Sequence, residues 1–280
     1  AFWIIIADTE TTSKPSSPLV LTCSEEPTDY KEVERILKIG KDNKWSVLNV
    51  DESTIKRSPK APFITSTLQQ AASSRLGYAP SRTMSIAQRL YEAGHITYMR
   101  TDSTNLSQLA LADIAKVVEK KYGKEYLQFR TYAQEAHEAI RPSHILVENA
   151  GLNEEQKILY RLIWERTVAS QMTDAELLRT KITANIDELG TIPDFHANGS
   201  RLVFPGWLKA DPEARGEDVE LPKLLKGDVL NLKDIRSEEK ATQPPGRYSE
   251  AGLIKELEKR GIGRPSTYAS IIRTIEERGY

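Results

Sequence analysis

The stretch HITYMRTDSTNLS, residues 95–107, holds a phenol, a cation and a carboxylate within five positions. Tyr98 is followed by Arg100 and Asp102. In an extended chain, side chains two positions apart lie on the same side, so these three could face one cleft. An ordinary phenol ionises only near pH ~10, and a neighbouring cation would favour its nucleophilic form. Packing is nevertheless the usual use of a tyrosine ring, so this stretch alone favours a core role.

Arg100 is suited to a phosphate ligand. A guanidinium can hold a phosphate with two hydrogen bonds, and a carboxylate such as Asp102 could orient it. The stretch therefore contains the residue types needed for attack on a phosphodiester. Whether they act together has to be judged from the other motifs of the chain.

A second stretch, QEAHEAIRPS, carries His137, Glu138 and Arg141. Helical spacing would place His137 and Arg141 on one face. The zinc-protease pattern H-E-x-x-H is not met, because Arg141 stands where the second histidine would be. A histidine and an arginine on one face suit a phosphodiester, with His137 able to donate a proton or a hydrogen bond. A histidine satisfied inside a helix-loop junction is the open alternative.

A third stretch, RGIGRPSTYAS, predicts an anion site at the start of a helix. Ser266 is expected to cap a helix over 267–278, whose first-turn amides would be free. Arg264 stands just ahead of that positive helix end, and Ser266 and Thr267 add hydroxyls. Glycines at 261 and 263 permit close approach of the backbone. An ordinary capped helix with a solvated Arg264 remains the alternative.

The elements that must position these residues follow from periodicity and from capping residues. Apolar runs predict strands at 2–6 and 47–50, and residues 176–236 alternate as several antiparallel strands. Lys56 to Pro62, with two prolines and three cations, predicts a linker. Helices are expected from Tyr30 to Ile39 with a stop at Gly40, from Ser66 to Leu76 with a stop at Gly77, from Ser81 to Ala93 with a stop at Gly94, from Ser107 to Tyr122, from Glu154 to Gln171, from Glu250 to Lys259 and from Thr267 to Arg278. In the helix at 154–171, Ile158, Leu162, Trp164 and Val168 are expected to lie in the core.

Composition indicates a globular protein of about two domains. The 280 residues carry a formal net charge of -1, but residues 59–142 carry +4 and residues 240–280 carry +3. Two basic segments could attract an anionic polymer, although plain solvated helices show such surpluses too. Cys23 is the only cysteine, which excludes an intramolecular disulfide and fits a reducing, cytoplasmic setting. No run of about 18 apolar residues could span a membrane, and no signal peptide is visible.

Several common site patterns are missing from the sequence. No D-x-D pair with metal spacing, no Walker loop and no dinucleotide fingerprint occurs. No metal site is therefore expected in this chain.

Four ordered motifs carry a family resemblance: APFITSTLQQAASSRLG, AQRLYEAGHITYMRTDSTNLS, QEAHEAIRP and LEKRGIGRPSTYASII. Together they closely resemble the bacterial type IA DNA topoisomerases, from about Lys56 to the C-terminus. The first 55 residues match more weakly.

The resemblance implies that Tyr98 attacks a phosphodiester of single-stranded DNA, giving a 5′-phosphotyrosyl link and a free 3′-hydroxyl, so that negative supercoils relax without ATP. It implies that Arg100 stabilises the phosphate, and that His137 and Arg264 contact the DNA backbone. The remaining DNA-binding positions, with less defined roles, are Gln88, Asp102, Arg141, Ser266 and Thr267.

The implied architecture is a multidomain α+β toroid fragment. Residues 1–58 and 143–245 would form a β-rich arch, residues 59–142 an inserted helical domain with the tyrosine, and residues 246–280 part of a helical base. The Mg²⁺-binding TOPRIM domain and C-terminal modules of the family have no counterpart, so we expect a fragment without its own cofactor and inactive alone. Its partners would be single-stranded and negatively supercoiled DNA and the rest of its polypeptide.

Two other functions stay open. In a non-catalytic DNA-binding module, the helical insert would act like a helix-turn-helix and Tyr98 would only pack. A phosphodiester hydrolase using His137 would need a metal or a second catalytic histidine, and the spacing shows neither.

Overall fold

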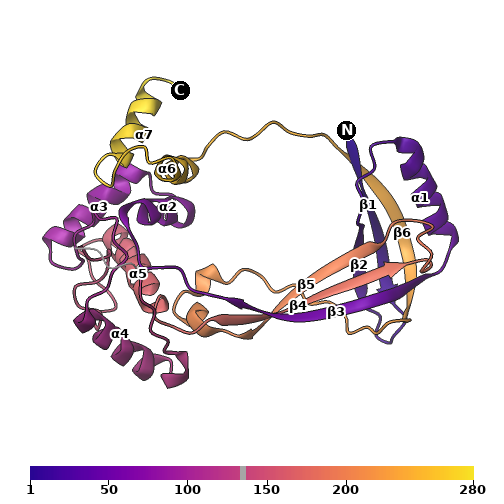
Figure 1. Ribbon diagram of the computed structural model, residues 1–280, viewed down its shortest axis with the longest axis horizontal. Coiled ribbons are helices and arrows are strands. Elements are labelled where there is room, and N and C mark those ends of the chain that lie inside the picture. The colour runs from indigo at the N-terminus through magenta and orange to yellow at the C-terminus, as the bar shows by residue number, and fades with distance from the viewer. Residues whose placement is uncertain (133–136) are drawn as a thin grey trace. The chain divides into compact units, whose positions relative to one another are not determined.

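The computed structural model describes residues 1–132 and 137–280 and divides the chain into two compact units. We call them the barrel unit (1–56, 176–204 and 216–246) and the helical unit (57–175, 205–215 and 247–280). The strands are β1 (Phe2–Thr11), β2 (Pro18–Cys23), β3 (Trp45–Arg57), β4 (Ala175–Asn185), β5 (Phe195–Phe204) and β6 (Val229–Lys240), and the helices are α1 (Tyr30–Asp42), α2 (Thr65–Leu76), α3 (Pro80–Glu92), α4 (Gln108–Lys121), α5 (Glu154–Ala169), α6 (Glu250–Lys259) and α7 (Tyr268–Glu277) (Figure 1). Short 3₁₀ turns lie at Lys124–Tyr126, Gly206–Lys209 and Pro212–Ala214.

The strands of the barrel unit form a closed barrel in the order β1-β2-β5-β4-β3-β6. Strands β1 and β6 pair antiparallel along a long ladder, from Phe2 opposite Lys240 to Thr11 opposite Leu230. Alternate side chains point inward, because successive residues of a strand face opposite sides. In β2 the pattern is strict, with Leu19, Leu21 and Cys23 buried. The expected strands at 2–6 and 47–50 and the antiparallel strands within 176–236 are confirmed.

Helix α1 packs on β1 and β6 and helps to close one side of the barrel core (Figure 1). The sequence predicted that it stops at Gly40, and this is wrong: the helix continues to Asp42. Instead, the missing side chain of Gly40 allows neighbouring core residues to pack closely against the helix. A Cβ there would lie 2.7 Å from Ile235 Cδ1 and 3.2 Å from the Trp45 ring. Trp45 is fully buried, donates from Nε1 to the Gly40 carbonyl at 2.8 Å and meets Phe195 edge to face.

The helical unit is built around α5, which is buried on most of its circumference from Leu159 onward. Helix α5 packs against α2 and α3, and α2 in turn packs against α6. The expected core positions Leu162, Trp164 and Val168 are confirmed, but Ile158 is exposed because it lies on the one open side of the helix. A small separate core joins α6 and α7 through Ile254, Leu257, Tyr268 and Ile272.

Three expected caps, Ser66, Ser81 and Ser266, are not the cap residues of their helices. Ser66 is not a cap: α2 begins at Thr65, and Ser66 donates to Glu258 Oε1 on α6 at 2.6 Å. Ser81 is not a cap either, because Pro80 occupies the first position of α3, where its missing N–H costs nothing. Ser107 caps α4 as predicted, accepting from the Ala110 amide. Gly77 ends α2 in the left-handed conformation, at φ 68°.

Two boundaries fall elsewhere than the sequence suggested. Residues 143–175 pack in the helical unit and not in the barrel unit, because α5 is the centre of the helical packing. Residues 247–280 belong to the same unit, through the contact of α6 with α2. The expected linker at 56–62 is shorter, since β3 runs to Arg57. Among the described residues, no helix is long and apolar enough to cross a membrane.

Candidate functional site

Tyr98 lies in an irregular segment of the helical unit, between α3 and α4. The strand expected at 95–98 is not formed, since only Ile96 makes an isolated bridge, to Pro142. The period of two persists nevertheless: Tyr98, Arg100 and Asp102 are exposed, and Met99, Thr101 and Ser103 are buried. The three candidate groups are therefore all open to solvent. Tyr98 is 47% exposed, so it is not a core aromatic.

Thr65, at the start of α2, holds this segment through hydrogen bonds to its backbone. Its buried hydroxyl donates to the Met99 carbonyl at 2.7 Å and accepts from the Thr101 amide at 3.0 Å. The Thr65 amide donates to the Thr101 carbonyl at 2.9 Å. Because buried backbone groups must be paired, this arrangement fixes the backbone on both sides of Arg100. Sequence reasoning missed Thr65, which reads as an ordinary helix start.

Thr97 joins the tyrosine segment to residues 139–142. Its amide donates to the Arg141 carbonyl, and its hydroxyl donates to the Ala139 carbonyl at 2.6 Å and accepts from the Arg141 amide at 2.9 Å. The motif that contains His137 is thereby held beside the motif that contains Tyr98. Thr97 gave no signal in the sequence beyond its place in the motif.

Arg100 connects the tyrosine segment to the third motif. Its Nη1 donates to the carbonyl oxygen of Ser266 at 3.1 Å. The expected partner, Asp102, makes no ion pair with Arg100 within 4.0 Å in the described part of the chain. The remaining N–H groups of this exposed guanidinium are thus available to an anion, and one carbonyl already fixes its direction.

The pKa of Tyr268, the first residue of α7, indicates which charges lie near the third motif. Burial raises the pKa of Tyr268, the charges of Glu258 and Asp102 add to the rise, and Arg264 opposes it. Asp102 and Arg264 therefore lie within electrostatic range of the same side chain.

The turn at 261–268 differs from the expected capped helix. Thr267, and not Ser266, occupies the cap position of α7, and its hydroxyl accepts from the Arg264 amide at 2.8 Å. The Arg264 guanidinium donates to the Gly263 carbonyl at 2.7 Å and is exposed. Gly263 has φ 81°, where a side chain would be strained. Ser266 is exposed and contributes its carbonyl to Arg100.

The described residues of the second motif, 137–143, are not helical, so the expected shared helical face of His137 and Arg141 is wrong. His137 is exposed and directly follows residues 133–136, which lie outside the described part of the chain. Arg141 is only 15% exposed; it pairs with Glu138 at 2.7 Å and donates to the Pro142 carbonyl. Burial works against ionisation of Glu138, but the hydrogen bond from Ser107 and the charge of Arg141 hold its pKa below the usual value. Arg141 thus already has an internal partner for its charge.

Helix α3 places further aromatic and polar side chains next to Tyr98. The Tyr91 ring, 41% exposed, lies 5.3 Å from the Tyr98 ring at an interplanar angle of 65°. Gln88, one turn earlier, donates to Glu92 Oε1 at 2.7 Å. Gln88 and Glu92 flank Tyr91 on α3, so an amide and a carboxylate accompany the aromatic pair. The sequence indicated Gln88 but gave no reason to select Tyr91 or Glu92.

No group of three or more His, Cys, Asp or Glu side chains in the described residues is placed to hold a metal ion.

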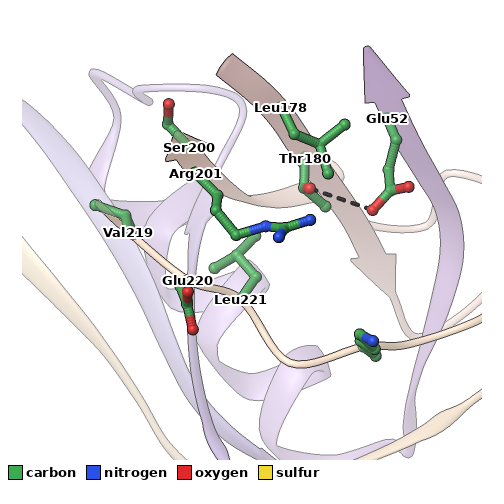
Figure 2. Close-up of a pocket in the computed structure, with 9 residues that line it drawn as sticks. Glu52, Leu178, Thr180, Ser200, Arg201, Val219, Glu220 and Leu221 are labelled. Carbon is green, nitrogen blue, oxygen red and sulfur yellow. Dashed lines mark hydrogen bonds between the residues drawn. The ribbon is translucent and has the colours of Figure 1, made fainter. Parts of the chain in front are cut away.

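A separate pocket in the barrel unit does not single out a class of ligand. It lies between β3, β4, β5 and the segment that follows Val219 (Figure 2). Charges of both signs line it: Arg201 and Lys223 against Glu52 and Glu220. Glu52 also accepts a hydrogen bond from Thr180 at 3.4 Å, drawn as the dashed line in Figure 2. The tyrosine segment and the 261–268 turn lie in the other unit.

Comparison with known proteins agrees with the motifs. A family model described as DNA topoisomerase matches residues 1–280. The chain is 46% identical over 295 aligned residues to DNA topoisomerase 1 of Salmonella typhimurium and 45% identical to DNA topoisomerase 1 of Escherichia coli. Each alignment covers all of this chain and 34% of the relative.

A solved structure shows the same fold. Full-length topoisomerase I from Thermotoga maritima matches with a TM-score of 0.82 and 33% identity, over 99% of this chain and 47% of that one. The chain spans about a third of the length of the curated relatives it matches. On its motifs, its fold and these matches over its whole length, the chain belongs to the bacterial DNA topoisomerase I family, of type IA.

Proposed function

We propose that this chain supplies the nucleophile and the phosphate-binding arginines of a DNA topoisomerase that cuts and rejoins one DNA strand. The observation that supports it most directly is the exposed Tyr98 in a segment whose Arg100 is hydrogen-bonded to the motif of Arg264. Two guanidiniums from distant parts of the sequence thereby belong to one local structure. Neither has a carboxylate within 4.0 Å among the described residues.

The proposed reaction is a reversible exchange of phosphodiester bonds. The Tyr98 phenol loses its proton, its oxygen bonds to the phosphorus, the bond to the 3′ oxygen breaks, and that oxygen takes up a proton. The product is a 5′-phosphotyrosyl link with a free 3′-hydroxyl. One ester replaces another, so the 3′-hydroxyl can attack in turn and reseal the strand without ATP.

Arg100 and Arg264 would neutralise the charge that grows on the phosphate during attack. Fixed donors of this kind are effective because they need no rearrangement at the moment of reaction. Both are held through the turn at 261–268, Arg100 by the Ser266 carbonyl and Arg264 by the Gly263 carbonyl. His137, Gln88, Asp102 and Thr267 would contact the DNA on either side.

We also propose that magnesium, strand passage and relaxation require parts of the protein outside these 280 residues. The isolated chain should not relax negatively supercoiled plasmid in the presence of magnesium. A full-length protein that contains this chain should relax it without ATP. Clear relaxation by the purified 280-residue chain would contradict the proposal that relaxation requires other parts of the protein.

The polarity of the covalent link tests the chemistry. A single-stranded oligonucleotide labelled at its 3′ end should become attached to the full-length protein after denaturation, because the protein holds the 5′ phosphate of the downstream fragment. The same oligonucleotide labelled at its 5′ end should give a short free fragment. The reverse pattern would contradict the proposed polarity of the link. No covalent product with either label would contradict the proposal as a whole and favour a non-catalytic DNA-binding module.

A further inference from the structure

A second pocket of the helical unit collects positive charge away from the tyrosine segment. It has a volume of about 290 Å³ and is formed by the loop before α2, by α2, by α5 and by the first turns of α6. Lys60, Arg75, Arg166 and Lys255 line it, and no carboxylate does. None of the sequence-predicted site residues takes part in its lining.

Only one of these four cations has a counter-ion. Arg75 makes two hydrogen bonds to Asp211, at 2.8 and 3.0 Å. Lys60, Arg166 and Lys255 have no carboxylate within 4.0 Å in the described part of the chain. Three cations of the pocket thus lack an ion-pair partner among the described residues. Desolvation lowers the pKa of Lys60, and the nearby Arg166, Arg75 and Arg57 lower it further.

Of the four cations, Arg166 indicates an anion site most strongly, because it is buried. Its guanidinium lies 4.1 Å from the centre of the Phe63 ring and makes one long hydrogen bond, of 3.4 Å, to the Ala61 carbonyl. Burial lowers its pKa to about 10, the charge of Asp211 opposes that shift, and Arg75 adds to it. A buried cation without a paired anion is costly, so a bound anion would stabilise this arrangement.

Neutral donors point to the same kind of ligand. The Gln70 amide nitrogen is buried and has no hydrogen-bond partner, although Gln70 lines the pocket. Ala251 and Gly252, in the first turn of α6, also line it. The Gly252 amide is capped by Ser249, while the Ala251 amide has no acceptor within the helix. Free first-turn amides and the helix dipole favour an anion at this position.

We propose that this pocket binds a phosphate group, through Lys60, Arg166, Lys255, the Gln70 amide and the first turn of α6. Thr67 and Ser74, which also line it, supply hydroxyls. The phosphate belongs either to a nucleic-acid backbone or to a small phosphate compound. Arg75 already pairs with Asp211, so the phosphate would pair with the other cations of the pocket.

The test compares charge reversals inside and outside the pocket. Lys60→Glu and Lys255→Glu each change one exposed side chain, so the fold should be kept. Lys120→Glu on α4 is the matched control, because Lys120 is exposed, unpaired within 4.0 Å among the described residues and absent from the pocket lining. Inorganic pyrophosphate is titrated into the 280-residue chain by calorimetry at low salt. Each pocket variant should bind about tenfold more weakly than the control.

A second titration identifies the source of the phosphate. A labelled single-stranded oligonucleotide is titrated at several salt concentrations. If the pocket holds a backbone phosphate, Lys255→Glu should lower the slope of log K against log salt by about 0.7 relative to Lys120→Glu. An unchanged slope together with lost pyrophosphate binding would assign the pocket to a small phosphate compound.

The proposal fails if wild type does not bind pyrophosphate at about millimolar concentration, or if both pocket variants bind it as the control does. No cleavage is measured in either titration. A failure of the role assigned to Tyr98 would therefore leave this result unaffected, and the reverse also holds.

Discussion

The Arg100 guanidinium donates a hydrogen bond to the backbone carbonyl of Ser266, 166 residues further along the chain. A backbone acceptor does not depend on the side chain at position 266, so the direction of Arg100 is set by the turn before α7. This turn also carries Arg264 and Thr267. The relationship explains how two motifs far apart in sequence can present their charges to one phosphate.

Arg100→Ala should lower the rate of covalent complex formation about 10²- to 10³-fold in the full-length protein, since it removes one fixed donor to the phosphate. Arg89→Ala is the matched control: Arg89 lies on the exposed side of α3 in the same unit. Rates are measured by denaturing gel after rapid quenching. Equal rates for the two variants would remove Arg100 from the chemistry.

Thr65→Val should destabilise the helical unit by about 1–3 kcal/mol, because it leaves the Met99 carbonyl with a lost donor and the Thr101 amide with a lost acceptor. Thr65→Ser keeps the hydroxyl and should lose much less. Urea unfolding of the 280-residue chain measures both. If Val and Ser cost the same, the hydroxyl does not hold the tyrosine segment.

The stability of the fold should fall as the pH drops below about 4.5, in part because of Glu138. A carboxyl whose pKa is lower in the folded than in the unfolded chain stabilises the fold above its unfolded pKa, and this contribution disappears as the pH falls through the folded pKa. Glu138→Gln should therefore be less stable at pH ~7 and lose less on acidification. Denaturant unfolding at a series of pH values checks this. Parallel curves for wild type and variant would show that Glu138 does not contribute.

Gly40→Ala should destabilise the barrel unit by about 1–3 kcal/mol, although alanine is the better helix former, because the new methyl would press on Ile235 Cδ1 at 2.7 Å. Ile235→Val removes that atom. In the double variant, the cost of Gly40→Ala should shrink when both are measured by urea unfolding. If the two costs simply add, the overlap with Ile235 is not the cause.

The sequence predicted well what depends on local pattern. Tyr98, Arg100 and Asp102 are exposed and alternate with buried residues, even though no strand forms there. Helix stops at glycine were right at Gly77, where the chain turns with positive φ, and wrong at Gly40, where the missing side chain serves a tertiary contact. A glycine looks the same in sequence in either role.

What the sequence could not predict depends on long-range packing. Ser66 is a residue type that often caps helices, but here it donates a hydrogen bond to Glu258 on α6. The ion pair of Arg141 with Glu138 was not predicted either. The contacts of Thr65 with Met99 and of Tyr91 with Tyr98, and the pocket that Arg166 lines, become visible only in the folded chain. Single side chains gave no signal of these partners.

The measurement that tests the central claim most directly compares Tyr98→Phe with Tyr91→Phe in the full-length protein. The centres of the two rings lie 5.3 Å apart and both residues are exposed, so each variant removes one phenolic oxygen from one of two neighbouring tyrosines. After incubation with a 3′-labelled oligonucleotide and denaturation, Tyr91→Phe should keep the covalent complex. Tyr98→Phe should lose it completely while binding the oligonucleotide within about threefold of wild type. A covalent complex that persists in Tyr98→Phe would contradict the account.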